Sequence, residues 1–436
     1  QAFYFDTMLA QGHPFAELAV SLRTPDLARA LTPQHGLYTL VEQAEQPNFR
    51  VIGCIAGAVS AAERPREVLA ALADPGIHTV TMTVTEKGYC LEAGGDLDVD
   101  HPDVKHDLAR GAVAKSLVGW LAQGLRARRD AAGGGLNVIS CDNLSDNGAK
   151  LSRALRQFLE AGGQTDLARW VEGEVLFPST MVDSITPATD QALRAQVDHA
   201  LGVLDAWPVQ REPFLQWVIE DRLGPRRSAF VEAGVTLTDD VAGYERAKLR
   251  LLNGAHSTLA YLGLALGHQT VAEAMADADL ARLIERMMRD DIAPVVGRVE
   301  GLDLTGYIAD VIARFRNPAV VHRLSQIAWD GSQKLPIRLL PTAMQALRGG
   351  RPVERFAVAT AAWLAFISAT AAARAPLTDP MADELLELGR EGSARNFLQL
   401  RAVFPERLAA DAGFAAAVEL AFGRLRSDKP RAVLDT

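Results

Sequence analysis

The first half of the chain alternates short apolar, β-branched segments with longer segments whose apolar residues recur at helical spacing. This alternation is typical of a parallel sheet with helices on its faces. After about Gly243 the strand-like segments stop, and the remainder shows helical periodicity broken by prolines and glycines. The sequence therefore predicts an α/β domain over residues 1–242 and an all-α domain over residues 243–436. The predicted strands are 49–55, 79–84, 136–140 and 174–178, and the predicted helices are 66–74, 107–130, 149–161, 243–265, 270–293, 303–315, 335–348, 352–374, 379–390 and 411–425.

Composition narrows the class of protein. With 48% hydrophobic and 23% charged residues, the chain is neither disordered nor collagen-like. A net charge of −9 without a basic block argues against a dedicated nucleic-acid binder. The three cysteines, Cys54, Cys90 and Cys141, are too few and too scattered for a disulfide framework or a zinc site. We expect a cytoplasmic protein with no metal, nucleic-acid or membrane partner.

Residues 356–373 contain no charge and reach the length of a membrane span. Half of them are alanine, and Arg355 and Arg374 bracket the segment. An all-round apolar helix of this kind is typical of a protein core, so we predict a buried helix of the second domain. The alternative is a membrane anchor.

The glycine pattern does not predict a nucleotide site. No G-x-G-x-x-G turn follows a predicted strand. The glycine triplet at 133–135 precedes the strand 136–140, so we predict a flexible connection there.

The segment 242–263 carries the most informative polar residues. In a regular helix Glu245, Lys248, Asn253 and His256 fall within an arc of ~140° and span ~12 Å between Lys248 and His256. Leucines around Lys248 disfavour its charged form, which suits a general base. A neutral Asn253 amide donates to a developing oxyanion, and Glu245 can pass protons to solvent. The alternative is a surface helix with an ordinary Glu–Lys pair.

Three further polar segments follow predicted elements. Asn143 lies in 140–148, directly after a strand, where open α/β sheets place ligands; the alternative is a loop that caps the next helix. Asp183 lies in 177–187, also after a strand. Lys334 and Arg338 lie in 329–338, predicted to be a loop between helices, where they bind a carboxylate or are simply solvated.

These segments together resemble the polyol-specific long-chain dehydrogenases, the mannitol dehydrogenase family. Lys248, Asn253 and His256 match the family's Lys-x4-Asn-x2-His signature without a gap. The resemblance covers essentially the whole chain. Its further blocks, in family order, are TVTEKGY, SCDNLSDNG, FPSTMVDSITPAT, EPFLQWVIED and DGSQKLP.

The resemblance implies a Rossmann-like N-terminal domain, an all-α C-terminal domain and an active site in the cleft between them, with NAD(H) as cofactor and no metal. It places the family's first strand and glycine turn immediately upstream of Gln1. The implied catalytic residues are Lys248 as acid/base, Asn143 and Asn253 as oxyanion donors, and Glu245 as proton relay. The implied substrate-binding residues are His256, Asp183 and Lys334, with Arg338 as a possible carboxylate partner, and the cofactor side is assigned to Thr85 and Glu86.

Within the family, the run QIAWDGSQKLPIR is similar to the fructuronate reductase branch, and Gln326 stands where the mannitol branch has Arg. We therefore predict reduction of D-fructuronate to D-mannonate with NADH, by a monomer or weak oligomer acting on a small sugar acid. The alternatives are mannitol 2-dehydrogenase, tagaturonate reductase and, in another class, a non-catalytic protein that binds a sugar acid or dinucleotide.

Overall fold

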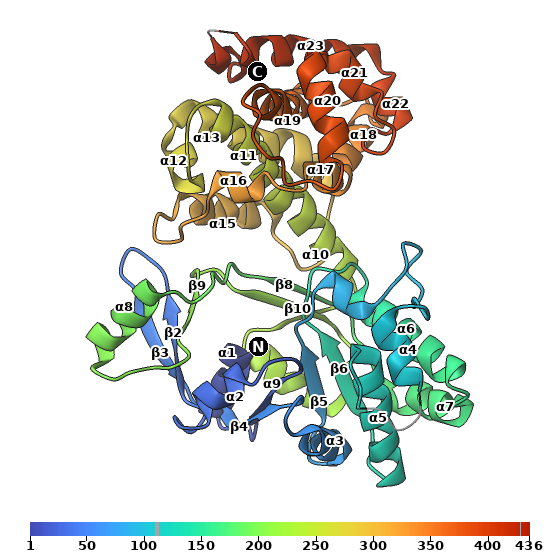
Figure 1. The fold of residues 1–436 in the computed structure, drawn as a ribbon. Coiled ribbons are helices and arrows are strands. Elements are labelled where there is room, and N and C mark those ends of the chain that lie inside the picture. The colour runs from blue at the N-terminus through green and yellow to red at the C-terminus, as the bar shows by residue number, and fades with distance from the viewer. Residues whose placement is uncertain (110–112, 428) are drawn as a thin grey trace. The chain divides into compact units, whose positions relative to one another are not determined.

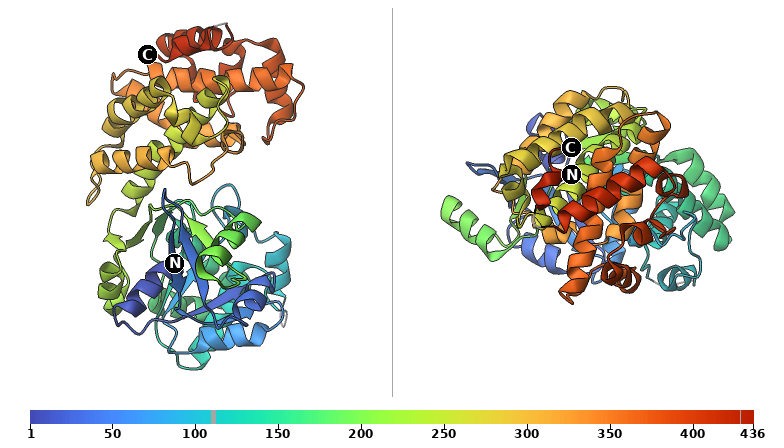
Figure 2. Two further views of the ribbon diagram at one scale, coloured as in Figure 1. Left: turned by 90° about the vertical axis from the view of Figure 1, so that its left-hand side faces the viewer. Right: turned by 90° about the horizontal axis from the view of Figure 1, so that it is seen from above.

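The computed structural model describes residues 1–109, 113–427 and 429–436, and it consists of two compact units, Gln1–Ala242 and Gly243–Thr436 (Figures 1 and 2). The first unit combines strands with helices, and the second is built of helices wherever the structure describes it. The predicted classes, α/β followed by all-α, are confirmed.

The strands of the first unit form four small sheets. The parallel pairings predicted from the alternation are present in the sheet β5-β6-β7 and in the pair β1-β4. Two further sheets, β3-β2-β9 and β11-β10-β8, each contain one antiparallel pair. The strands are β1 (Glu17–Ser21), β2 (Tyr38–Glu42), β3 (Asn48–Ile52), β4 (Ile55–Ser60), β5 (Thr79–Met82), β6 (Leu136–Ser140), β7 (Val175–Leu176), β8 (Thr180–Asp183), β9 (Val209–Arg211), β10 (Gln216–Glu220) and β11 (Thr236–Thr238).

The single strand predicted over 49–55 is wrong. The chain forms β3 and β4 there, and they belong to different sheets. The Asp6 carboxylate accepts a hydrogen bond from the Gly53 N–H at 2.8 Å, which holds the backbone between the two strands away from either ladder. A contact from so distant a residue leaves no trace in local hydropathy.

The helices of the first unit surround these sheets (Figure 1). They are α1 (Ala2–Ala10), α2 (Asp26–Leu31), α3 (Pro65–Ala73), α4 (Pro102–Leu108), α5 (Leu117–Asp130), α6 (Asn147–Ala161), α7 (Thr165–Glu174), α8 (Gln191–Leu201) and α9 (Arg227–Glu232), with 3-10 turns η1 (Glu86–Tyr89) and η2 (Gly224–Arg226). The continuous helix predicted over 107–130 is wrong, although part of it, 110–112, lies outside the described residues. Ser116 caps α5 by accepting from the Gly119 N–H at 3.0 Å, and the Asp107 carboxylate accepts from the Ser116 N–H at 2.7 Å.

The strand β6 lies at the centre of its sheet and every residue of it is buried. Its near-continuous apolar run is typical of a parallel strand covered on both faces. At its start, the buried Arg128 side chain donates to the carbonyls of Gly134 at 2.7 Å and Asp74 at 2.8 Å. The glycine triplet therefore connects α5 to β6, as predicted, but a buried guanidinium fixes it in place.

The second unit is a helical assembly around α19 (Figure 1). Its helices are α10 (Val241–Ala247, which crosses the boundary), α11 (Ala255–Ala265), α12 (Val271–Ala276), α13 (Ala278–Arg286), α14 (Ala293–Val296), α15 (Leu304–Arg316), α16 (Leu324–Ile327), α17 (Gly331–Arg338), α18 (Leu340–Arg348), α19 (Glu354–Ala372), α20 (Ala382–Glu391), α21 (Ala394–Leu398), α22 (Glu406–Ala409), α23 (Ala412–Leu425), the π-helices η3 (Lys248–Gly254) and η4 (Met287–Ile292), and the 3-10 turn η5 (Pro430–Val433). Among the described residues, α19 is the one helix long and apolar enough to cross a membrane, and 72% of its apolar window is buried within the protein. That burial is what a core helix requires, as predicted for 356–373.

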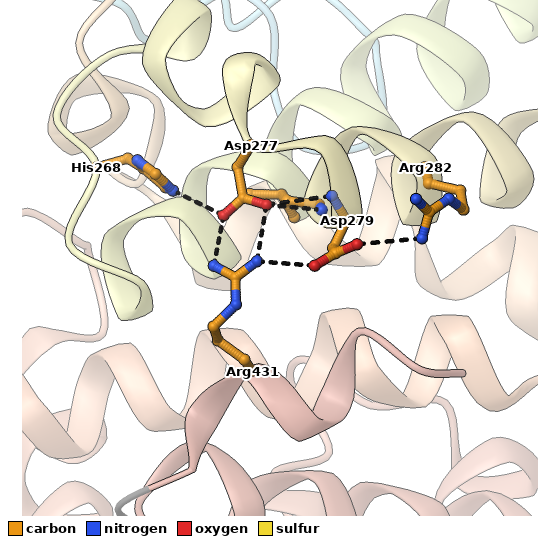
Figure 3. Close-up of polar contacts among 6 residues, drawn as sticks. His268, Asp277, Asp279, Arg282 and Arg431 are labelled. Atoms are coloured by element: carbon orange, nitrogen blue, oxygen red, sulfur yellow. Dashed lines mark hydrogen bonds and ion pairs between the residues drawn. The ribbon is translucent and has the colours of Figure 1, made fainter.

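The helix predicted over 270–293 is interrupted at Asp277, which caps α13 and anchors the C-terminal turn η5 (Figure 3). The Asp277 carboxylate accepts from Arg431 Nη1 at 2.6 Å and Nη2 at 3.0 Å. Asp279 accepts from Arg431 at 3.0 Å, and His268 lies 3.4 Å from Asp277. These hydrogen bonds hold the pKa of Asp277 well below its usual range. The end of the chain is thereby fixed to the beginning of a helix far from it in sequence.

Candidate active site

The segment that carries the Lys-x4-Asn-x2-His spacing is not a regular α-helix. Residues Lys248–Gly254 form the π-helix η3 between α10 and α11. In an α-helix, residues five apart point ~140° away from each other, at ~100° per residue. A π-helix forms i→i+5 hydrogen bonds, which bring such residues to the same side, and π-turns are frequent at functional sites. The π-helix therefore places Lys248 and Asn253 on one side, which a regular helix over 243–265 would not have done.

The helix α17 brings Lys334 and Arg338 to this segment. The loop predicted over 329–338 is wrong, because Asp379 caps this stretch by accepting from the Ser332 N–H at 2.9 Å and starts a helix. Arg338 Nη1 lies 3.4 Å from the Ser257 hydroxyl of α11. Lys334 donates to the Ile327 carbonyl at 3.2 Å. Burial, followed by repulsion from Arg338, lowers the pKa of Lys334.

His256 is the most enclosed of the predicted site residues of the second unit. Its ring stacks on Phe315 with centroids 5.2 Å apart and lies 4.8 Å from the ring of His322. Burial lowers its pKa well below the ordinary value, and the basic groups His322, Arg338, Arg314 and Lys334 lower it further. His256 is therefore a neutral imidazole at pH 7, able to donate one hydrogen bond and accept another.

Six predicted residues thus belong to one part of the second unit. Glu245, Lys248 and Asn253 are half-buried, so each side chain is held by the protein while part of it reaches solvent. His256 adjoins them on α11, and α17 adds Lys334 and Arg338. This neighbourhood combines an amine, an amide, an imidazole and a carboxylate, the groups that acid–base chemistry and hydroxyl recognition require.

In the first unit, two loops leave the sheet at one edge. β5 and β6 are parallel neighbours, with Met82 opposite Ser140 in the register. Because the carboxyl ends of parallel strands meet at the same edge, Thr85 and Glu86 after β5 leave the sheet beside Asn143 after β6. All three side chains are exposed at this edge.

A buried polar network supports the loop of Asn143. The Tyr89 hydroxyl contacts Ser140 and the Asp142 carboxylate, and Ser140 donates to Asp142 at 2.6 Å. Burial raises the pKa of Tyr89, so its hydroxyl stays protonated and donates. Asn147 pairs with Thr180 in both directions, donating at 3.1 Å and accepting at 2.9 Å. The residues flanking exposed Asn143 are therefore fixed to the start of β8.

Asp183 is the last residue of β8 and is buried, so part of the polar segment 177–187 is itself a strand. The buried network, Arg314 and His322 were not predicted from the sequence. Tyr89 and Asn147 lie in the polar blocks noted in the sequence, but nothing local distinguishes a network residue from a loop residue. His322 is an isolated histidine, and only its contact with His256 gives it meaning.

The first unit contains a cavity away from the predicted residues, and the described part of the chain offers no metal site. No group of three or more His, Cys, Asp and Glu side chains there is arranged to hold a metal ion. A cavity of about 600 Å³ lies against α6 and α7 in the first unit, and none of the predicted site residues lines it. Its walls mix Arg153, Arg156 and Arg222 with four acids.

Comparison with known proteins gives matches along the chain. Residues 3–228 match the model of the mannitol dehydrogenase Rossmann domain, and residues 240–426 match that of the mannitol dehydrogenase C-terminal domain. Mannitol 2-dehydrogenase of Pyrenophora tritici-repentis is 34% identical over 100% of this chain and 78% of its own length. D-mannonate oxidoreductase of Escherichia coli is 36% identical over 92% of this chain and 84% of its own length.

Solved structures agree. Pseudomonas fluorescens mannitol 2-dehydrogenase, in a ternary complex with NAD and D-mannitol, is 34% identical with a TM-score of 0.81, covering 100% of this chain and 90% of that one. A substrate-free D-sorbitol dehydrogenase is 29% identical with a TM-score of 0.91, covering 99% and 91%.

Proposed function

The chain belongs to the mannitol dehydrogenase family, and we propose that within this family of NAD-dependent secondary-alcohol dehydrogenases it interconverts D-fructuronate and D-mannonate. The observation that carries the choice of a sugar acid is the set of cationic side chains near His256: Arg338, Arg314 and Lys334 each lower the pKa of its imidazole. A carboxylate beside such charges gains charge-assisted hydrogen bonds, whereas a neutral polyol gains only the weaker ordinary ones. The 36% identity to D-mannonate oxidoreductase supports the same choice.

The residues of the first unit fit one part of a dinucleotide. The Thr85 hydroxyl and the Asn143 amide lie at the edge of the sheet where open α/β folds hold nucleotides, and both can donate to a ribose or a carboxamide. The glycine turn that usually binds a pyrophosphate does not occur among the 436 residues. Thr85 and Glu86 are therefore proposed for the nicotinamide side. When bound, NADH supplies the hydride that reduces the C5 ketone.

The acid–base step is assigned to the π-helix. Protonated Lys248 gives its proton to the oxygen that becomes the C5 hydroxyl, and in oxidation neutral Lys248 takes that proton back. Asn253, on the same side of η3, donates to the oxygen while its negative charge develops, and Asn143 is proposed as the second amide donor. Glu245, one turn before Lys248, is proposed to return protons to solvent. His256 and Asp183 are proposed to hold hydroxyls, and Lys334 or Arg338 the carboxylate.

The first test is reduction of D-fructuronate, D-tagaturonate and D-fructose in parallel by the full-length protein, followed by the loss of NADH absorbance. Turnover of fructuronate well above the others supports the proposal. Turnover of fructose alone assigns the chain to the mannitol 2-dehydrogenase activity, the second candidate, which the 34% identity to two such enzymes favours. Turnover of tagaturonate alone would identify the substrate as a different hexuronate.

The second test is Lys248→Ala, with NADH binding measured by fluorescence. We expect turnover to fall by at least ~10²-fold, the typical contribution of general acid–base catalysis, while NADH binds as before. Preserved turnover would contradict the role of Lys248. A parent protein that binds sugar acids without any turnover would instead support the non-catalytic alternative.

A further inference from the structure

Two histidines from different elements of the second unit face each other. His256 belongs to α11, and His322 lies in the connection between α15 and α16, elements that Figure 1 shows beside α11. Their ring centroids are 4.8 Å apart and their planes are inclined by 53°. The His256 ring also stacks on Phe315, with centroids 5.2 Å apart, so two aromatic rings contact it. Its orientation is therefore fixed before any ligand binds.

The Nε2 atom of His256 is buried and has no hydrogen-bond partner among the residues that the structure describes. His256 is only 9% exposed. A buried polar nitrogen without a partner costs free energy, and it is tolerated where a ligand or water completes its hydrogen bonding. This atom therefore indicates a place that a polar ligand group occupies.

Arg338, Arg314 and Lys334 place positive charge near His256, and each lowers the pKa of its imidazole. The side chains that act most strongly on His256 are His322, Arg338, Arg314 and Lys334, contributed by α15, the connection after it, and α17. Arg314 acts in the same direction on His322 and, with burial, lowers its pKa. The acids Asp330 and Asp379 act on Lys334 in the opposite direction and raise its pKa. A region of this charge favours a bound anion over a neutral group.

We infer that His322 is a specificity-determining residue, which donates a hydrogen bond to the carboxylate of a sugar acid whose hydroxyl group contacts His256. This inference rests on the proposed function, because it concerns the same site. A neutral imidazole offers one N–H donor, and the bound carboxylate offsets the positive charge of Lys334 and Arg338. A neutral polyol presents only a hydroxyl there, so His322 discriminates between acids and polyols.

The kinetic test is His322→Phe, which keeps an aromatic ring against His256 and removes both ring nitrogens. For D-fructuronate we expect kcat/KM to fall ~10–100-fold, mainly through KM, because a hydrogen bond to a charged group is lost. Reduction of D-fructose, where the parent shows it, should change less than ~3-fold. His322→Asn, which restores a donor, should recover part of the loss. The matched control is His268→Phe, a histidine of the same unit that contacts Asp277 instead.

The binding test separates this inference from the proposed reaction. The imidazole C–H resonances of His256 and His322, assigned with the variants His256→Gln and His322→Phe, are followed by NMR during addition of D-mannonate or D-mannitol. We expect D-mannonate to shift both resonances and D-mannitol to leave that of His322 unchanged, whether or not the protein turns over either compound. Equal responses to the two ligands, no response to D-mannonate, or an unchanged KM in His322→Phe would each overturn the role of His322. Loss of turnover alone contradicts only the proposed reaction.

Discussion

The carbonyl oxygen of Arg338 would lie 3.0 Å from a β-carbon placed on Gly254, so a glycine at this position is what lets α17 pack directly against the π-helix. Gly254 follows Asn253 directly and is the last residue before α11. The close approach therefore connects the carboxylate-binding candidates of α17 to the proposed acid–base residues. A backbone atom cannot rotate away as a side chain does.

Gly254→Ala is expected to destabilise the protein by about 1–3 kcal/mol, because α17 must move to admit the methyl group. It should also raise KM for the sugar acid, since Lys334 and Arg338 move with α17. Urea unfolding and steady-state kinetics measure the two effects. The matched control is Gly423→Ala in α23, where nothing lies within 4 Å and the helix gains about 0.5–1 kcal/mol. Equal stability changes in the two variants would contradict the close approach.

Asn147→Ala and Asn143→Ala should separate stability from catalysis. Asn147 is fully buried and satisfies both the N–H and the carbonyl of Thr180, so its loss leaves buried groups unpaired at a cost of about 1–3 kcal/mol. Asn143 is exposed, so its replacement should leave the unfolding midpoint nearly unchanged. Its loss should instead lower kcat by about 10²-fold, as removal of an oxyanion donor does. Thermal unfolding and kcat together test the pair, and a stable but fully active Asn143→Ala would refute the proposed donor.

His256 should make the protein less stable in mild acid. Its pKa in the folded protein lies well below the ordinary value of about 6.5, so below pH ~6.5 the unfolded chain binds a proton that the folded chain does not. The free energy of unfolding therefore falls as pH falls through this range, by up to about 1.4 kcal/mol per pH unit, and the effect is absent above it. His256→Gln should flatten the dependence below about pH 6.5, where an ordinary imidazole takes up a proton. The exposed His199 serves as control, and an unchanged slope in His256→Gln would rule out the effect.

Arg431→Ala should release the C-terminal turn η5 from α13 (Figure 3). We expect a loss in Tm of ~2–4 °C and faster cleavage of residues 429–436 in limited proteolysis, with kcat unchanged. The stability that the Asp277–Arg431 interaction gives the folded protein is present above the ordinary Asp pKa of ~3.9 and is lost only as pH falls below it. The variant should therefore differ most from the parent protein at neutral pH. Arg401→Ala, which breaks an ion pair between two exposed side chains, is the control. Identical proteolysis of both variants would show that Arg431 does not anchor the turn.

β6 and α17 show how far secondary structure could be predicted from the sequence: β6 was predicted correctly, and α17 was not. The apolar run 136–140 predicts β6 at its observed bounds, because a strand buried on both faces needs an unbroken hydrophobic segment. The polar stretch 331–338 reads as a loop, since it contains a glycine, a proline and few apolar residues. It is a helix because Asp379 caps it and Gly331 lies against Trp363 and Tyr261, contacts with residues far from it in the chain.

The sequence by itself determined the order of the two fold classes and the family, because periodicity and short motifs are properties of neighbouring residues, and it proposes the Lys248, Asn253 and His256 set. Only the tertiary structure decided that Lys248 and Asn253 share one side of a π-helix, since i→i+4 and i→i+5 bonding differ little locally and packing selects between them. It alone also placed His322 against His256 and Asn147 against Thr180. Contacts between residues far apart in the chain exist only once helices and strands have packed, and these contacts fix where the charge and the hydrogen-bond donors of the site lie.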